Sequence, residues 1–208
     1  MKLELGEAPI GKVASLARIP IAFRVEQVLD VTRTENGQGG FVLTARPIPT
    51  PYLKDYDAIP GEGPSQWARH FDLSHWGFIE ARVAGRLVGG AVIAFRTANI
   101  IMLEGREDLA VLWDIRVSPD SRGRGIGSAL FRAAEAWALA NGCRQLKVET
   151  QNINLPACRF YEHHGCALKT VNRFAYPGFP EEIQLLWSKD ISPAHSSRVK
   201  SSPSQRLG

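Results

Sequence analysis

Asp120-Ser121-Arg122-Gly123-Arg124-Gly125-Ile126-Gly127-Ser128 is a glycine-rich stretch between a predicted strand and a predicted helix. Its glycines let the backbone approach a ligand closely and adopt positive φ where this is needed. Successive backbone N–H groups can then point into one concavity, and the start of the following helix adds partial positive charge. The two arginines add full charges. The stretch therefore predicts a loop that binds a pyrophosphate.

Three other interpretations of this loop compete. A Walker A loop needs Lys and then Ser or Thr after its last glycine, but Gly127 is followed by Ser128-Ala129. A Rossmann loop needs its glycines close behind the strand, but residues 118–122 intervene, although Glu149 lies near the distance of that fold's ribose-binding acid. The third is a plain turn before a capped helix. The two arginines and a second motif downstream favour the phosphate loop.

The flanking sequence predicts an α+β domain. Alternating or continuous apolar runs predict strands, and apolar residues at helical spacing predict helices. The predicted strands are 22–31, 39–45, 77–84, 86–95, 110–117, 144–149, 167–176 and 182–188, and the predicted helices are 10–18, 125–141 and 155–164. We expect turns at Asn36-Gly37 and Gly85. Strands 110–117 and 144–149, joined by a helix, should be parallel neighbours in a βαβ unit.

Length and composition predict one domain with a sizeable core. The chain has 208 residues, 44% of them hydrophobic and 22% charged, which is ordinary for a globular protein. Residues 46–64, RPIPTPYLKDYDAIPGEGP, are rich in Pro and Gly and are predicted to form a long loop. Residues 192–208 have almost no apolar content, so we expect a disordered tail. The predicted domain is therefore 1–191.

Charge and cysteine content indicate a cytoplasmic protein. The net charge of +4 is weak evidence for a polyanionic partner, and we expect neither nucleic acid nor a membrane. No apolar run approaches the roughly 20 residues that span a bilayer, and the N-terminus lacks a signal peptide's apolar stretch. Cys143, Cys158 and Cys166 form no CxxC pair, and their spacing to His163 and His164 matches no zinc finger, so no metal site is expected.

Two motifs in order resemble the GNAT superfamily of N-acetyltransferases. Residues 122–127, RGRGIG, resemble its Arg/Gln-x-x-Gly-x-Gly/Ala signature, and residues 154–165, NLPACRFYEHHG, resemble its second conserved stretch. The resemblance covers residues 78–176 well. It implies a GNAT fold, which is a mixed, mostly antiparallel sheet with a central βαβ unit and a splay between two parallel strands. It also implies acetyl-CoA as the acyl donor.

Further stretches look like streptothricin acetyltransferases within that superfamily. They are residues 149–154, ETQNIN, with 157–161, and residues 41–56 near the N-terminus. This resemblance implies acetylation of a primary amine on a small molecule, with a streptothricin-type antibiotic as first candidate and antibiotic resistance as the role. Protein or peptide N-acetylation and a non-catalytic acyl-CoA-binding module are alternatives, and a homodimer is left open. The retained Tyr161 speaks against the non-catalytic alternative.

The resemblance assigns roles to residues of the cofactor site. Residues 122–128 would bind the pyrophosphate, and the backbone of Ile115 and Val117 would bind the pantetheine amides between the splayed strands. The Asn154 side chain would bind the same arm, although its position before Leu155-Pro156 also suits a helix N-cap. Tyr161 resembles the family's general acid, whose hydroxyl protonates the departing thiolate.

Three carboxylates are candidates for the base or for contacts with the acceptor. Asp114 is the first candidate, and strand alternation places it on the face opposite Trp113 and Ile115. Glu149 is its rival, and Glu80 is a candidate substrate contact. Aromatic residues could hold a cationic amine by cation–π contacts or could simply form core. They are Trp67, His70, Phe71, His75, Trp76 and Trp113, of which we favour Trp76 and Trp113 as substrate residues.

Overall fold

A seven-stranded mixed sheet organises the computed structural model, which describes residues 2–34 and 40–191. All neighbouring strands in it are antiparallel except β6 and β7, which are parallel, so the predicted α+β GNAT-type sheet is confirmed. In spatial order the strands are β1 (Leu3–Glu7), β4 (Gly77–Val83), β5 (Arg86–Ala94), β6 (Leu109–Val117), β7 (Gln145–Gln151), β9 (Gln184–Asp190) and β8 (Ala167–Asn172).

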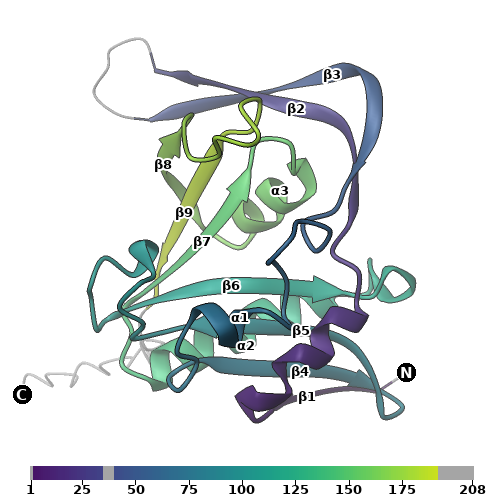
Figure 1. Cartoon of the computed structure of the whole chain (residues 1–208), viewed down its shortest axis with the longest axis vertical. Helices are drawn as coiled ribbons and strands as arrows, with labels where there is room; N and C mark the ends of the chain where they lie inside the picture. Colours follow the sequence, from purple (N-terminus) through teal and green to yellow (C-terminus); the bar gives the residue numbers. More distant parts are fainter. Residues whose placement is uncertain (1, 35–39, 192–208) are drawn as a thin grey trace, which may run out of the picture.

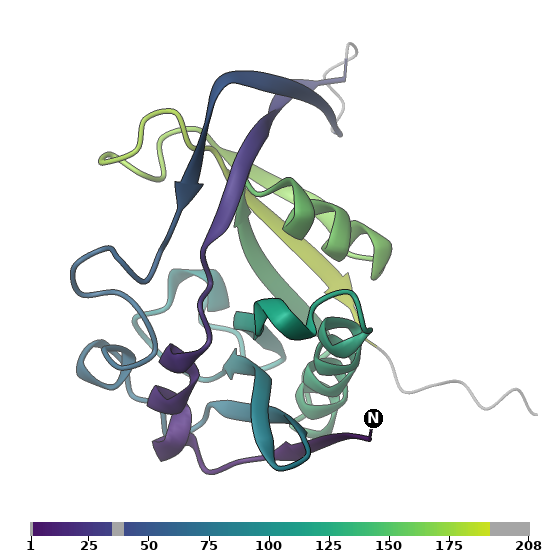
Figure 2. The same cartoon turned by 90° about the vertical axis from the view of Figure 1, so that its right-hand side faces the viewer.

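Helix α2 (Ile126–Ala140) connects β6 to β7 and covers one face of the sheet, as Figures 1 and 2 show. Its buried residues recur at helical spacing, so one apolar stripe faces the strands. They are Ile126, Leu130, Phe131, Ala134 and Ala138. The helix ends at Asn141-Gly142, where Gly142 adopts φ +82°, and β7 starts three residues later. The predicted βαβ unit is therefore confirmed.

A second apolar cluster fills the opposite face of the sheet. It combines the 3-10 helices η1 (Ile10–Arg18) and η2 (Ile101–Leu103) with α1 (Trp67–His70). Leu16 and Phe78 are completely buried within it. A further 3-10 turn, η3 (Pro119–Ser121), and helix α3 (Leu155–His163) flank the end of the sheet where β6 and β7 separate.

Strands β2 (Phe23–Arg33) and β3 (Phe41–Lys54) form a separate two-stranded ribbon that arches over the β7–β9–β8 end of the molecule (Figure 1). The prediction of a loop over 46–64 is therefore wrong for its first half, because β3 continues to Lys54. Pro47, Pro49 and Pro51 alternate, so their nitrogens face one side of β3. A strand with a free edge tolerates prolines in that arrangement. Residues 55–66 form turns and bends.

The remaining differences from the prediction are small. Strand β1 was not predicted, because it is a five-residue edge strand whose side chains are mostly exposed. Strand β8 ends at Asn172 rather than at 176. The hairpin turn at Gly85 is confirmed, with φ +76°. The predicted turn at Asn36-Gly37 and the predicted tail 192–208 lie outside the described residues. Within the described part of the chain, no helix has both the length and the apolar character needed to cross a bilayer.

Candidate active site

The splay between β6 and β7 is the centre of the candidate site. The two strands pair only from Leu109↔Gln145 to Leu112↔Val148, and beyond these residues they diverge. A cavity of about 680 Å³ lies at the divergence and is lined by both strands, by the start of α2, by α3 and by the segments 56–63 and 176–182. Backbone groups of β6 that would otherwise pair with β7 border this cavity. The site therefore suits an extended ligand that inserts between the strands, as the resemblance predicts.

A β-bulge at Trp113 changes which side chains of β6 face the same way. In the pairing with β5, Val92 opposes Asp114 and Ile93 opposes Leu112, so Trp113 is the extra residue. Trp113 packs in the cluster of η1 and α1, while Ile115 packs against the α2 side. The prediction that Asp114 faces away from both neighbours is therefore wrong for Trp113, because simple alternation fails at a bulge.

The glycine-rich loop has the backbone that a phosphate ligand requires. Gly123 and Gly125 adopt φ +72° and +77°, and a Cβ at either position would have no atom within 4 Å. Gly125 is the N-cap of α2, so the first free N–H groups of that helix follow directly. A Cβ on Gly127 would lie 3.5 Å from the Phe160 ring. The loop is thus open and shaped for close approach, which fits a pyrophosphate.

The side chains of this loop divide between core and cavity. Arg122 lines the cavity, and its guanidinium donates to the carbonyls of Val117 at 3.0 Å and Pro20 at 3.3 Å. Arg124 is exposed, and Ser128 is half-buried in the first turn of α2. Ile126 is buried in the core, so it can offer a ligand only its backbone.

The predicted pantetheine contacts line the cavity from both sides. Ile115 and Val117 are half-buried on β6 beyond the last pair with β7. Asn154 lies opposite them at the start of α3, where its Oδ1 accepts the Ala157 N–H at 3.2 Å. The capping role of Asn154 is therefore present, and its side chain also borders the cavity. These residues fit a pantetheine arm.

Tyr161 lies on the buried side of α3 and borders the cavity. Its side chain is 5% exposed and packs against the rings of Phe131 and Phe160. Among the described residues, no hydrogen-bond partner of its hydroxyl is found, and the residue lines the cavity. Burial raises the pKa of Tyr161 well above its usual range, and the Asp114 charge adds to this. The hydroxyl is therefore held in its protonated form, as a proton donor must be.

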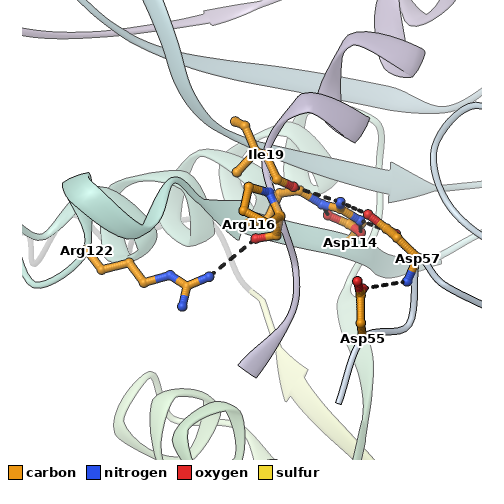
Figure 3. A network of polar contacts seen from close by, with 7 residues as sticks. Ile19, Asp55, Asp57, Asp114, Arg116 and Arg122 are labelled. Atoms are coloured by element: carbon orange, nitrogen blue, oxygen red, sulfur yellow. Dashed lines mark hydrogen bonds and ion pairs between the residues drawn. The ribbon is translucent and has the colours of Figure 1, made fainter. Parts of the chain in front are cut away.

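The Asp114 carboxylate is engaged by a neighbouring cation. Arg116 Nε and Nη2 donate to its two oxygens at 2.9 and 2.5 Å (Figure 3). Arg116 Nη1 also donates to the Ile19 carbonyl at 3.0 Å and to Asp57 at 2.6 Å. Burial raises the pKa of Asp114 against the opposing effect of Arg116. Because both oxygens are paired, Asp114 is poorly placed to take a proton from an acceptor.

Glu149 has a different environment at the other side of the splay. It lies on β7 in the cavity lining, half-buried. Its Oε1 accepts the Tyr176 hydroxyl at 2.5 Å, and its Oε2 accepts Gln184 Nε2 at 2.8 Å. Gln151 Nε2 lies at 3.4 Å. Within the described chain, all of its hydrogen-bond donors are neutral, so Glu149 presents a net negative charge to the cavity.

The predicted substrate residues are only partly brought together. Trp113 lines the cavity, as does Trp67, whereas Trp76 is buried behind them and donates from Nε1 to Thr97 Oγ1 at 2.8 Å. Glu80 is not among the lining residues, and its carboxylate accepts Arg82 Nε at 2.9 Å. The structure therefore places neither Trp76 nor Glu80 at the cavity.

Several cavity residues were not predicted from the sequence. Two of them, Asp57 and Arg116, form an ion pair in the cavity lining, and others come from the segment between β8 and β9. The residues are Phe23, Tyr56, Asp57, Arg116, Tyr176, Phe179 and Glu182. Apart from Tyr56, which ends the N-terminal stretch of the resemblance, no motif marks them, because they converge from separate segments. Among residues 2–34 and 40–191, no group of His, Cys, Asp and Glu side chains could hold a metal ion.

Comparison with known proteins finds streptothricin acetyltransferases among the relatives. A segment of 80 residues is 40% identical to streptothricin acetyltransferase A of Bacillus subtilis, and it covers 38% of the chain and 46% of that relative. The chain is 30% identical over 169 residues to streptothricin acetyltransferase of Escherichia coli, which covers 79% of the chain and 83% of the relative. It is 27% identical over 179 residues to that of Streptomyces lavendulae, covering 86% and 89%.

Solved structures share the fold. Nourseothricin acetyltransferase aligns with a TM-score of 0.70 at 24% identity and covers 92% of this chain and 100% of its own. A Bacillus anthracis protein in complex with acetyl coenzyme A aligns with a TM-score of 0.71 at 21% identity, covering 91% and 99%. Residues 45–166 match the acetyltransferase (GNAT) family. The chain therefore belongs to the GNAT family and is an N-acetyltransferase that uses acetyl-CoA.

Proposed function

We propose that the chain acetylates a primary amine on a small cationic molecule of the streptothricin type. The observation that carries the proposal is the Glu149 carboxylate, which lies in the cavity with neutral hydrogen-bond donors around it. A carboxylate without a cationic partner attracts an ammonium group. The relatives from Escherichia coli and Streptomyces lavendulae, which are named streptothricin acetyltransferases, support the same acceptor class.

The chain's residues then divide the proton transfers between them. Acetyl-CoA supplies its acetyl group through a thioester, whose carbon–sulfur bond breaks as the carbon–nitrogen bond to the acceptor forms. An amine with a pKa near 10 is only about a thousandth neutral at pH 7, so a group in the site has to remove a proton. Glu149 Oε1 or Oε2 can accept that proton, and Tyr161 Oη gives a proton to the departing thiolate. The nitrogen loses a second proton as the amide forms, and this proton restores the Tyr161 hydroxyl. We assign the base to Glu149 rather than Asp114, because Arg116 occupies both Asp114 oxygens.

Aromatic residues in the lining of the same cavity suit the remainder of a cationic acceptor. Trp67 and Trp113 meet edge to face with ring centroids 6.5 Å apart, and both line the cavity. Rings in such a position can hold a cation by cation–π attraction. Asp57 adds a carboxylate whose side chain is 26% exposed and whose charge is shared with Arg116. The lining therefore offers aromatic rings and carboxylates to one ligand.

The test is thiol release from acetyl-CoA in the presence of a panel of amines. The panel contains streptothricin, simple mono- and diamines, a neutral amine of similar size, and a peptide with a free N-terminus. We expect turnover with streptothricin and preference for cationic amines over the neutral one. Turnover of the peptide alone would favour protein N-acetylation. Binding of acetyl-CoA without thiol release for any amine would favour a non-catalytic module.

A further inference from the structure

The segment between β8 and β9, residues 173–183, is tied to the rest of the site by two separate sets of contacts. In the first, Lys54 at the end of β3 pairs with Glu182, and its ammonium lies 3.6 Å from the centroid of the Phe179 ring. The second set passes through Tyr176 and ends at Glu149. The first set can anchor the segment without touching Glu149. The second set contacts Glu149 directly, so it can determine how the Glu149 carboxylate is held.

A chain of hydrogen bonds leads from the segment after β3 to the acceptor carboxylate. The Tyr56 hydroxyl donates to Gln151 Oε1 at 2.6 Å, and Gln151 Nε2 donates to the Tyr176 hydroxyl at 2.9 Å. The Tyr176 hydroxyl in turn donates to Glu149 Oε1 at 2.5 Å. Three separate segments, residues 55–66, β7 and residues 173–183, thus contribute to one directed chain.

The charge of Glu149 determines the direction of every bond in this chain. An ionised carboxylate can only accept, so Tyr176 has to donate to it. The oxygen of Tyr176 is then free to accept from Gln151, which must present its NH₂ group there and its carbonyl oxygen to Tyr56. Each member has one arrangement that satisfies its neighbours. A network that is satisfied in this way holds its side chains in a single geometry.

We propose that Tyr176 is a positioning residue that, through Glu149, holds the acceptor ammonium at the splay. The inference rests on the proposed function, since it requires Glu149 to meet the acceptor. Tyr176 holds Oε1 while Gln184 Nε2 holds Oε2 at 2.8 Å, so both oxygens of a cavity-lining carboxylate have fixed directions, and each has a lone pair left for an ammonium. Burial and the Glu149 charge raise the pKa of Tyr176, which keeps its hydroxyl a donor.

A double-mutant cycle tests whether Tyr176 acts through Glu149. Tyr176→Phe keeps the ring and removes only the hydroxyl. We expect kcat/KM for streptothricin to fall between about tenfold and 10²-fold, as misplacement of a reacting group does. In the Glu149→Gln background the same change should cause no further loss, because the two effects are coupled. Calorimetric Kd values for streptothricin should show the same non-additivity, so the cycle closes even if Glu149→Gln has no measurable turnover.

Two other variants separate positioning from simple anchoring of the segment. Lys54→Met breaks the contact with Glu182 and should not reproduce the non-additive pattern with Glu149→Gln. Phe174→Ala changes an 89% exposed residue of the same segment and should leave kcat/KM unchanged. The Kd for acetyl-CoA should stay within about twofold in all variants, since none touches the glycine-rich loop.

The outcomes distinguish the two proposals. If Tyr176→Phe reduces kcat/KM equally with and without Glu149→Gln, Tyr176 acts independently and the inference is overturned. A strong loss in Glu149→Gln with none in Tyr176→Phe overturns the inference but leaves the proposed function standing. No loss in Glu149→Gln itself, in either kcat/KM or streptothricin affinity, overturns the roles given to Glu149 and this inference with them. Absence of both turnover and binding of streptothricin in the parent protein overturns the proposed function.

Discussion

Tyr161 and Asp114 show how neighbours decide the role of a titratable residue. Both lie at the cavity and both are buried, but Tyr161 has no hydrogen-bond partner within the described chain, whereas Asp114 has Arg116 on both oxygens. A free hydroxyl with a raised pKa can give a proton to a ligand. A carboxylate in a bidentate ion pair has both oxygens engaged, and it stabilises the fold instead of accepting a proton. We therefore expect the two residues to differ in function, although both line the cavity.

Tyr161→Phe should reduce kcat by about 10² to 10⁴-fold, which is the usual contribution of a proton donor. The ring can keep its contacts with Phe131 and Phe160, so the Kd for acetyl-CoA should change little. Steady-state kinetics and calorimetry measure the two quantities. Tyr52→Phe is the matched control, because Tyr52 is 42% exposed and does not line the cavity. Equal losses in kcat and in acetyl-CoA affinity would contradict the donor role.

At the residue scale, the residues predicted for the cofactor side include several that line the cavity, whereas Trp76 and Glu80 on the predicted acceptor side do not. Tyr161, Asn154 and the loop 122–128 belong to contiguous motifs, so local sequence was enough to single them out, and their roles remain those that the resemblance implies. Arg116 could not be assigned, because its partners Asp57 and Ile19 are distant in sequence. Asp114 looked available for a different reason: strand alternation places Arg116 on the same face two residues away, but it does not show that the two side chains pair.

At the scale of elements, the bulge in β6 and the loop before α2 do the most to shape the site. The bulge turns Trp113 to the face that also carries Asp114 and Arg116. The loop brings the start of α2 to the mouth of the splay, with Gly125 as its cap. The loop depends on the positive φ of Gly123 and Gly125, a conformation that glycine adopts readily.

Gly125→Val should remove the rise in Tm that millimolar acetyl-CoA produces in the parent protein. A side chain would fill the open side of the loop, and the left-handed backbone at φ +77° adds strain of about 1–2 kcal/mol. Gly105→Val is the matched control for strain, because Gly105 has φ +65°, is equally open and lies outside the glycine-rich loop. It should lower Tm without affecting the shift. Loss of the shift in both variants would show that strain alone is responsible.

Helices and strands were predicted correctly where one hydrophobic periodicity ran through a segment. They were missed where two features of the sequence indicated different structures. Helix α2 was predicted within a residue or two, because its apolar stripe and its Asn-Gly stop agree. The strand character of 46–54 was missed because prolines usually interrupt strands, and only pairing with β2 reveals that their side of β3 is free. The bulge at Trp113 depends on register with β5, which no single segment encodes.

At the scale of the whole molecule, burial of groups that ionise at high pH limits the pH range over which the folded state is stable. Burial raises the pKa of Cys143, Cys158 and Cys166 to about 11 in each case, and raises that of Tyr161 further. In the unfolded chain these groups ionise near pH 8.5 for thiols and 10 for tyrosine. The folded state therefore retains protons that the unfolded state has released.

The free energy of unfolding should consequently be constant below about pH 8.5 with respect to these groups and fall as the pH rises above it. Each group contributes up to about 1.4 kcal/mol per pH unit between its unfolded and folded pKa values. Urea denaturation at pH 7, 9 and 10.5 measures the loss. A variant with alanine in place of all three cysteines should lose less stability between pH 7 and 9.5. An unchanged slope in that variant would mean that other groups dominate.

The splay also bears on how a sheet avoids aggregation. An unpaired strand edge is a template on which a strand of another chain can form. At the outside of this molecule the edges are short, as β1 is, or carry prolines, as β3 does. A further stretch of unused pairing capacity, where β6 and β7 diverge, borders the cavity instead. Other segments of the chain line this cavity, so an extended small ligand needs less room to reach the unpaired edge than a strand of another protein does. The molecule thus keeps an unpaired strand edge for its ligand within the lining of its own site.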